Sequence, residues 1–399
     1  MRGLGRAIDP AAAGSERSLR LACLHVVLLL SPTHGSGRAN GARRLPDEHV
    51  SDGVERGQEL EHSARRAAGP FRRYPNEMEK RTLKRTDLTV SRACFGTMTF
   101  GSQVDEADSI RIVDYCLDSG IDFLDTANVY NKGISETIVG KALKGRRDRV
   151  VLASKVRGRM GDAPDESGLS RAAIRKGIED SLRRLQTDYL DLYYLHQPDY
   201  SAPLEESLGA VDELVREGKV RYPASSNYSG WQVCQMQWIA EARGYKPAVI
   251  AQPMYNLLAR AIEPEYLPMT KEFEISTVVY NPLAGGLLTG KQKPGQPVSG
   301  TRFDGNQMYL SRYWHDAYFK AVADLLSIAQ AAGRSPVSLA LNWLLHHTPT
   351  DCVILGASRL SQIEENVKAM EDGALAADTV AACDRVWAEV RGVTPEYNR

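Results

Sequence analysis

Short apolar runs alternate with longer stretches of helical periodicity along most of the chain. Each run is bounded by polar residues or glycine and is apolar on both faces, which is typical of a buried parallel strand. Eight strands are therefore expected, near residues 93–97, 123–127, 150–155, 188–196, 220–227, 248–252, 275–282 and 351–356.

The stretches between these runs are amphipathic and carry helix-capping residues. Ser135 is expected to cap the helix after the second strand and Gly145 to end it, while Ser170 precedes the next helix. The helices are expected at 105–120, 135–145, 170–186, 203–219, 231–244, 264–274, 315–332, from Pro336 onward, and at 360–370. The stretch near 284–313 has no clear period and is expected to be irregular.

Strand–helix units in series with short connections predict a closed (β/α)8 TIM barrel. A doubly wound open sheet is the competing arrangement, and it normally carries a G-x-G-x-x-G turn after its first strand. No such turn follows the first predicted strand of this chain. We therefore expect residues 78–399 to form one α/β barrel domain.

The first 77 residues differ in composition from the rest, with twelve arginines and no lysine. An apolar run at 21–30 is reminiscent of a signal peptide, but a long charged region precedes it and no clear cleavage site follows. Met78 opens a segment that looks like a natural amino terminus. We expect residues 1–77 to be disordered, or to come from an over-extended gene start, rather than to be a targeting segment.

Composition and charge narrow the function classes. The 399 residues are 43% hydrophobic and carry a formal net charge of zero, so neither a nucleic acid nor a membrane is indicated as a partner. The six cysteines are scattered, which suits reduced thiols, and no apolar run is long enough to span a bilayer. We expect a cytoplasmic protein without a metal site; its oligomeric state stays open.

Polar residues follow or end three consecutive predicted strands. Asp125 and Tyr130 belong to the second, Lys155 to the third and His196 to the fourth. Each residue alone is more often a turn or packing residue, so the hypothesis depends on the set. Because the carboxyl ends of barrel strands meet at one mouth, an acid, a phenol, an amine and an imidazole are expected to converge there.

These four groups suit carbonyl reduction or the reverse alcohol oxidation. A free phenol has a pKa of about 10, and the Lys155 ammonium is expected to lower the pKa of Tyr130 so that it donates a proton at neutral pH. Asp125 is expected to hold Lys155 charged. His196 is expected to hydrogen-bond the substrate oxygen and to relay a proton.

A cofactor site is indicated after the last two predicted strands. A glycine turn leads into a helix whose amino terminus favours a phosphate, although a capped surface helix is the alternative. The candidate contacts there are Gly356, Ser358, Arg359, Gln362, Glu365 and Asn366. After the seventh strand, Tyr280 is placed to stack on a nicotinamide ring, and Gly285 and Gly286 permit close approach of a pyrophosphate. Arg359 suits a 2′-phosphate, which favours NADPH over NADH.

Six segments resemble, in order, the signature segments of the aldo-keto reductase superfamily, and together they cover roughly 82–370: DTANVY, LASK, LHQPD, ASSN, VVYNPLAGGLLTGK and LGASRLSQIEEN. The last two are more similar to the bacterial and potassium-channel-β-subunit-like branch. The resemblance implies a catalytic tetrad of Asp125, Tyr130, Lys155 and His196. It also implies cofactor contacts at Ser226, Asn227, Gln252, Pro282, Leu283, Gly285, Leu287, Lys291 and Arg302, and Asn281 stands where a serine is more usual.

The sequence therefore predicts an NADPH-dependent oxidoreductase that reduces aldehydes or ketones, with a small carbonyl compound as its partner. The aromatic residues that could line its pocket are Phe100, Tyr130, Tyr228, Tyr255 and Trp314. A regulatory subunit that binds NADPH to sense redox state is one alternative. A metal-dependent barrel hydrolase is the other, but it would need metal-ligand spacing such as H-x-H, which is absent.

Overall fold

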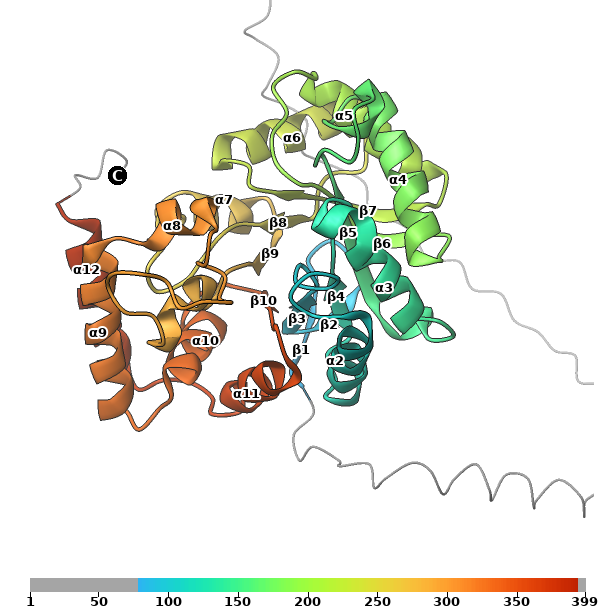
Figure 1. The fold of residues 1–399 in the computed structure, drawn as a ribbon. Helices are drawn as coiled ribbons and strands as arrows, with labels where there is room; N and C mark the ends of the chain where they lie inside the picture. The colour runs from blue at the N-terminus through green and yellow to red at the C-terminus, as the bar shows by residue number, and fades with distance from the viewer. Residues whose placement is uncertain (1–77, 394–399) are drawn as a thin grey trace, which may run out of the picture. The chain divides into compact units, whose positions relative to one another are not determined.

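Eight parallel strands close into a barrel in the computed structural model of the protein, which describes residues 78–393 (Figure 1). These residues fall within one unit, Arg72–Arg399. The strands are β3 (Ala93–Gly96), β4 (Phe123–Asp125), β5 (Val151–Val156), β6 (Leu190–Leu195), β7 (Val220–Ser226), β8 (Ile250–Gln252), β9 (Ser276–Val279) and β10 (Cys352–Leu355). They neighbour one another in chain order, and β10 pairs with β3 to close the ring. The predicted TIM barrel is confirmed. The expectation about residues 1–77 lies outside the described residues.

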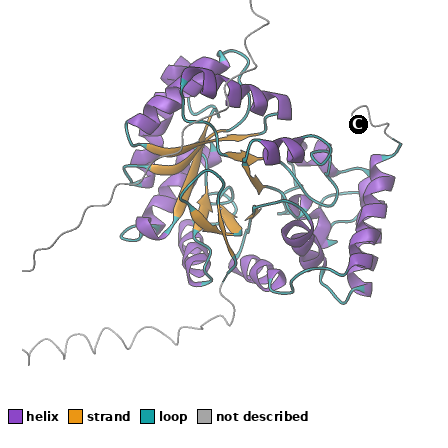
Figure 2. Cartoon of the chain, turned by 180° about the vertical axis from the view of Figure 1, so that it is seen from behind, coloured by secondary structure: helices purple, strands orange, loops and turns teal. Residues whose placement is uncertain are grey.

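Helices surround the barrel and cover the outer faces of its strands (Figure 2). Those at predicted positions are α2 (Glu106–Asp118), α3 (Ile134–Ala142), α4 (Arg171–Leu185), α5 (Leu204–Arg216), α6 (Gly230–Arg243), α7 (Tyr266–Glu272), α9 (Asp316–Ala331), α10 (Pro336–His347) and α11 (Leu360–Met370). Ser170 caps α4 as predicted, because its side chain accepts a hydrogen bond from the Ala173 amide.

The predicted cap of α3 is wrong. The helix begins after Gly133, whose φ of 89° turns the chain, and Ser135 lies buried inside the first turn. The Ser135 hydroxyl bonds instead to the hydroxyl of Thr97 (2.8 Å) and to that of Thr126 (3.1 Å). Ser135 therefore ties α3 to the ends of the first two barrel strands.

Several elements were not predicted. They are the antiparallel hairpin of β1 (Lys80–Thr82) and β2 (Thr89–Ser91), α12 (Ala377–Arg391), α8 (Gln307–Tyr313) and the 3-10 segments η1 (Tyr130–Gly133), η2 (Arg147–Arg149), η3 (Pro164–Glu166) and η4 (Ala284–Thr289). The stretch near 284–313 is thus not wholly irregular, since it contains η4 and α8.

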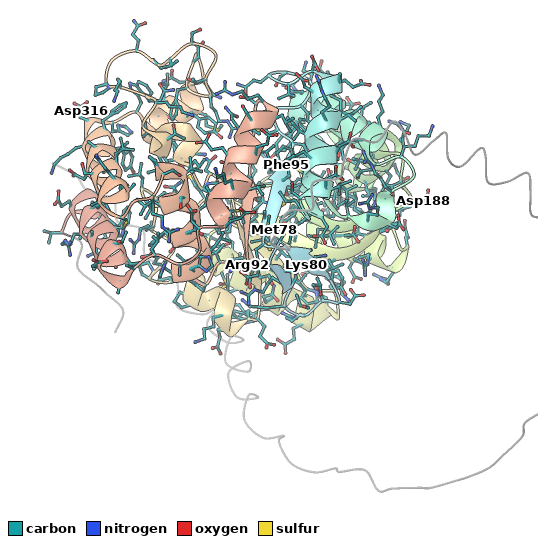
Figure 3. The ribbon with its side chains drawn as sticks, turned by 90° about the horizontal axis from the view of Figure 1, so that it is seen from below. Met78, Lys80, Arg92, Phe95, Asp188 and Asp316 are labelled. Carbon is teal, nitrogen blue, oxygen red and sulfur yellow. The ribbon has the colours of Figure 1, made fainter. Side chains whose placement is uncertain are left out.

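The hairpin lies at the amino-terminal end of the barrel strands, which Figure 3 views from below. Leu83, Leu88 and Val90 belong to the same buried cluster as the residues that fill the barrel. Buried Arg92 donates to the carbonyls of Leu345 (2.6 Å) and Thr350 (2.9 Å), which fastens this segment to the barrel. This end is therefore plugged.

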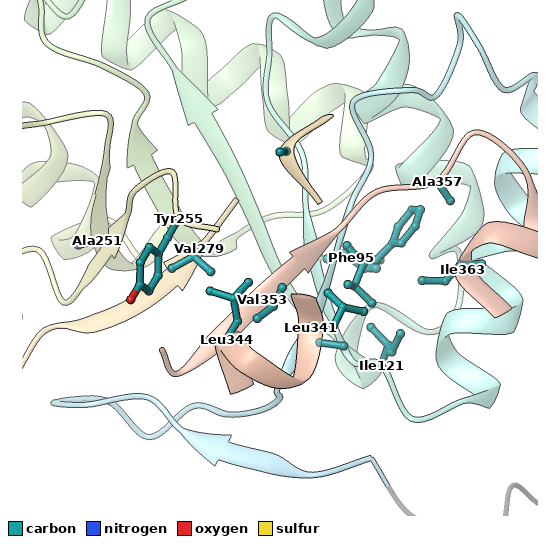
Figure 4. Close-up of a cluster of buried hydrophobic side chains, with 14 of the residues drawn as sticks. Phe95, Ile121, Ala251, Tyr255, Val279, Leu341, Leu344, Val353, Ala357 and Ile363 are labelled. Carbon is teal, nitrogen blue, oxygen red and sulfur yellow. The ribbon is translucent and has the colours of Figure 1, made fainter. Parts of the chain in front are cut away.

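Apolar side chains fill the space both inside the barrel and around it. Outside, Phe95 and Val353 on the strands pack with Leu341 and Ile363 on the helices (Figure 4). Inside, the cluster includes Cys94, Phe123, Ala153, Leu192, Tyr194, Ala224, Ile250, Val278 and Cys352. The open mouth at the carboxyl ends of the strands is thus the place left for a site. Between residues 78 and 393, no helix has the length and apolar character to cross a membrane.

Candidate active site

The last inward-facing layer of the barrel forms the candidate site. Side chains alternate between the two faces of a strand, so a residue two positions beyond an interior residue also faces inward. The interior cluster contains Phe123, Ala153, Tyr194, Ala224, Ile250 and Val278. The residues two positions further along are Asp125, Lys155, His196, Ser226, Gln252 and Tyr280. Because side chains face inward at every second position, polar groups from six strands meet in one layer at the barrel mouth.

Lys155 is the centre of this layer and has no exposed side-chain surface. Its ammonium contacts the carboxylate of Asp125 and donates to the carbonyl oxygen of Thr126 at 2.8 Å. It also lies 3.4 Å from the hydroxyl oxygen of Tyr130. The other oxygen of Asp125 accepts from Nε2 of Gln252 at 2.9 Å. A buried ammonium needs partners of this kind, since an unpaired buried charge is costly.

Electrostatics keep Lys155 protonated. Burial alone would lower the pKa of its ammonium, but the Asp125 carboxylate and the Tyr130 hydroxyl more than offset this. The pKa of Lys155 is therefore raised, and the group is an ammonium at neutral pH.

The pKa of Tyr130 is raised, whereas the sequence analysis expected it to be lowered. Burial raises the pKa of its phenol, and the nearby Lys155 ammonium lowers it by less than burial raises it. The prediction that Lys155 brings this pKa below its ordinary value is wrong for the free site, because removing the phenolate from water outweighs one neighbouring charge. Tyr130 therefore holds its proton in the free protein.

His196 faces Tyr130 across the mouth. Their ring centroids lie 6.0 Å apart and the rings are nearly perpendicular, at 76°. Burial first, and then the charges of Lys155 and Arg157, lower the pKa of the imidazole to about 3. A neutral imidazole suits hydrogen bonding to a substrate oxygen, but proton relay through an imidazolium is not favoured near neutral pH.

The residues expected at the carboxamide lie directly beside these groups. Ser226 donates from its hydroxyl to the carbonyl of Gln252 at 3.0 Å. Asn227 donates from Nδ2 to the carbonyl of His196 at 2.8 Å, and its Oδ1 accepts from the Tyr280 hydroxyl at 2.7 Å. One hydrogen-bonded layer therefore links these residues with the candidate acid and base groups.

The loop after β9 turns on two glycines. Gly285 and Gly286 have φ values of 70° and 102°, and a Cβ at Gly285 would lie 2.8 Å from the ring of Tyr309. Only glycine fits such a position without displacing its neighbours. The expected pyrophosphate contacts differ in access: Pro282 and Leu287 are buried, Leu283 is half-buried and Lys291 is exposed.

Arg302 connects this loop with the end of β10. Its guanidinium lies 5.5 Å from the ring centroid of Tyr309, and its Nη2 is 3.5 Å from where a Cβ at Gly356 would stand. At the start of α11, the amide and hydroxyl of Ser358 both donate to Oε1 of Gln362, at 2.8 and 3.2 Å. The structure therefore brings the cationic side chain of Arg302 close to the α11 amino terminus.

The remaining α11 candidates differ in exposure. Arg359 and Glu365 are exposed, whereas Asn366 is only 4% exposed. Among residues 78–393, Arg359 has neither a side-chain hydrogen bond nor an ion pair. Its guanidinium is thus available at the helix start.

The aldo/keto reductase family model matches residues 92–388. The chain belongs to the aldo/keto reductase family. It is 39% identical over 305 residues to the uncharacterized oxidoreductase YrpG of Bacillus subtilis, covering 74% of this chain and 91% of that protein. Aflatoxin B1 aldehyde reductase member 2 of Homo sapiens is 36% identical over 349 residues, covering 82% and 95% respectively.

A potassium channel subunit is similar to this chain at nearly the same level. The probable voltage-gated potassium channel subunit beta of Arabidopsis thaliana is 35% identical over 301 residues, covering 74% of this chain and 92% of that protein. The resemblance to the aldo-keto reductases, including the branch related to channel subunits, is therefore confirmed.

Most aromatic residues expected in the pocket of this aldo/keto reductase are core residues instead. Phe100, Tyr228 and Tyr255 are buried, and Tyr255 packs edge-on against Trp343 with ring centroids 5.3 Å apart. Trp314 is half-buried and packs on Phe303 at 5.2 Å. Helices cover two of these side chains, since Tyr255 packs against Trp343 of α10 and Trp314 packs edge-on against Phe319 of α9.

Some contacts in the candidate site leave no pattern in the sequence. The bond from Gln252 to Asp125 joins strands far apart in the sequence, and no local pattern reveals it. Asn131 had a usable signal, because Asn-Lys-Gly after Tyr130 is turn chemistry that tolerates left-handed backbone. In the described segment 78–393, no three His, Cys, Asp or Glu side chains are grouped so that they could hold a metal ion.

Proposed function

We propose that this aldo/keto reductase uses NADPH to reduce aldehydes and ketones to alcohols, with Tyr130 as the general acid. The observation that carries the proposal is the 3.4 Å contact between the fully buried Lys155 ammonium and the Tyr130 hydroxyl. The similar human protein named for aflatoxin B1 aldehyde reduction supports aldehydes as one substrate class.

The tetrad accounts for the proton that carbonyl reduction requires. When bound, NADPH would supply the hydride for the carbonyl carbon. Tyr130 donates its proton to the carbonyl oxygen, which leaves a phenolate beside the Lys155 ammonium. That ammonium is held charged by the Asp125 carboxylate, and it stabilises negative charge as the charge develops. The raised pKa of the free phenol thus keeps the proton in place until a substrate oxygen accepts it.

His196 completes the site as an uncharged donor. Because its pKa is lowered to about 3, its imidazole is neutral at any ordinary working pH. One ring nitrogen of a neutral imidazole can donate to the substrate oxygen and hold it opposite Tyr130. Its role is orientation of the substrate, while Tyr130 transfers the proton.

Three features support a phosphate-bearing cofactor. Nδ2 of buried Asn281 has no hydrogen-bond partner within residues 78–393, so a donor is left unpaired in the loop that the family places along the pyrophosphate. Arg302 adds a cation, since its Nη2 is 3.5 Å from where a Cβ at Gly356 would stand, beside the amino terminus of α11. Exposed Arg359 at the start of α11 supports a 2′-phosphate and hence NADPH.

Titration of the full chain with NADPH and with NADH, followed by nucleotide fluorescence, tests the cofactor. A panel of aldehydes and ketones is then screened for consumption of the bound nucleotide. Tight NADPH binding and turnover of carbonyls are expected. Folded protein that binds neither nucleotide would refute the reductase assignment.

A redox-sensing regulatory subunit is the second candidate, favoured by the similarity to a plant channel subunit beta. It would share the nucleotide site and differ in turnover. Tight NADPH binding with slow oxidation by every carbonyl, together with stable association with a membrane channel, would support this function. Rapid multiple turnover would support the reductase.

A further inference from the structure

Three successive residues after Tyr130 adopt left-handed backbone conformations. The φ angles are 48° at Asn131, 54° at Lys132 and 89° at Gly133. Residues other than glycine enter this region at a cost in free energy, and such strain persists only where surrounding contacts impose it. The turn that carries the candidate acid is therefore held by specific contacts.

Asn131 supplies the contacts on one side of this turn. Its Nδ2 lies 2.6 Å from the carbonyl oxygen of Phe100, 3.3 Å from that of Met98 and 3.2 Å from Oγ of Ser102. All three acceptors belong to the loop that joins β3 to α2. One amide thus fastens the Tyr130 turn to a neighbouring loop of the barrel mouth.

The opposite side of the turn rests on an ion pair. A Cβ at Gly133 would lie 2.7 Å from Cδ of Arg184, so the backbone packs directly on that side chain. Nε of Arg184 donates at 2.7 Å to Oε2 of Glu136, whose side chain is fully buried. Arg184 and Glu136 therefore support the turn at Gly133, and Asn131 holds it against the neighbouring loop.

We propose that Asn131 is a positioning residue for Tyr130, because its amide holds the left-handed turn against residues 98–102 and thereby keeps the phenol within reach of Lys155. The inference rests on the proposed function of Tyr130. At 3.4 Å the phenol–ammonium contact is near the limit of a hydrogen bond, so a small shift of the turn removes it.

Asparagine meets both requirements of this position. It tolerates left-handed backbone, and its NH2 group donates two hydrogens. Glycine keeps the backbone freedom and loses the donor, whereas aspartate keeps the shape and replaces the donor with an acceptor. Asn131→Gly and Asn131→Asp therefore remove the same hydrogen bonds in two different ways.

The test measures kcat, KM and the NADPH dissociation constant of both variants in the full chain, with 4-nitrobenzaldehyde as the probe. We expect kcat to fall roughly tenfold or more, since small misplacement of a catalytic group is costly. KM and NADPH affinity are expected to change less than about twofold, because neither depends on proton donation. Glu274→Gly is the matched control: Glu274 also has a left-handed φ, of 50°, and precedes β9 at the other end of the barrel.

The pH profile separates positioning from simple destabilisation. With Tyr130 farther from Lys155, less positive charge favours the phenolate, so the alkaline limb of kcat for reduction is expected to move to higher pH. A lower fraction of folded protein would reduce kcat and leave the limb unmoved. Wild-type kcat in both variants, or a reduced kcat with an unmoved limb, would overturn the proposal.

Exchange of the backbone amide hydrogens measures the stability of the Tyr130 turn without depending on catalytic activity. The amides of Tyr130 and Lys132 donate to Ala127 and Val129, each at 3.1 Å. Faster exchange of the peptide spanning 126–134 is expected in Asn131→Asp, with unchanged exchange in the peptide around Glu274. If the wild type reduces no carbonyl, the proposed function fails while this experiment still decides the positioning role. Equal exchange in wild type and Asn131→Asp would refute it.

Discussion

Replacing Asp125 with asparagine tests the electrostatic design of the site most directly. The amide is nearly isosteric with the carboxylate, and Gln252 can turn its own amide to bond the new residue. Lys155 keeps the carbonyl of Thr126 as an acceptor at 2.8 Å. The substitution therefore removes one charge and little of the surrounding geometry.

The loss of this charge changes the state of Lys155. Burial acts to lower the pKa of its ammonium, and the Asp125 carboxylate is the larger of the two groups that offset burial. Without a counter-charge, burial lowers the pKa of a lysine, by up to about 3 to 5 pH units for a fully buried group. A much larger share of Lys155 is thus expected to be neutral at pH 7 in the variant and unable to stabilise the developing phenolate.

The expected cost follows from the stabilisation that is lost. Removal of one group that stabilises transition-state charge costs about 3 kcal/mol, which corresponds to roughly a hundredfold in kcat. Stability is expected to fall by about 2 kcal/mol, less than for most broken buried pairs, because Lys155 can lose its proton. Steady-state kinetics and urea unfolding measure the two quantities.

The direction in which kcat changes with pH tests the role of Asp125 more sharply than the size of the loss in kcat. A lowered pKa means that Lys155 regains its charge as the pH falls, so kcat of Asp125→Asn is expected to rise toward acid pH. The wild type keeps the ammonium throughout this range and is expected to be flat. Asp191→Asn is the control, since Asp191 is equally buried but pairs with Arg147 and Arg221 at the other end of β6. A variant with less than threefold loss and a flat profile would refute the assigned role of Asp125.

Four further outcomes are expected. Tyr130→Phe should lower kcat by roughly 10² to 10⁴, with unchanged NADPH affinity by fluorescence titration, since the phenol acts on the substrate. The wild-type kcat profile should show no limb near pH 6.5, because the pKa of His196 is about 3. Arg359→Ala should weaken NADPH binding roughly tenfold and spare NADH, as expected for one lost charge-assisted hydrogen bond. Removal of residues 1–77 should leave kcat unchanged, and a large loss on removal would contradict the domain assignment.

The alternation of apolar runs and helical periods was enough to predict the barrel, because parallel strands that are buried on both faces are continuous apolar runs in the sequence. Asp125, Lys155 and His196 each end or follow one of these apolar runs, and the barrel topology then brought their side chains together. The strands of the hairpin, β1 and β2, form no such run, since each has three residues and β1 is exposed.

Tertiary structure alone decided the charge states and several roles. The raised pKa of Tyr130 and the lowered pKa of His196 depend on burial from all directions, which one strand's pattern does not contain. Likewise, Tyr255 is a core residue because Trp343 on α10 packs against it. Asn131 can hydrogen-bond the carbonyl of Phe100 because the loop after β3 lies beside it. Periodicity records which face of an element is buried, whereas distances between elements arise only when the chain closes into the barrel.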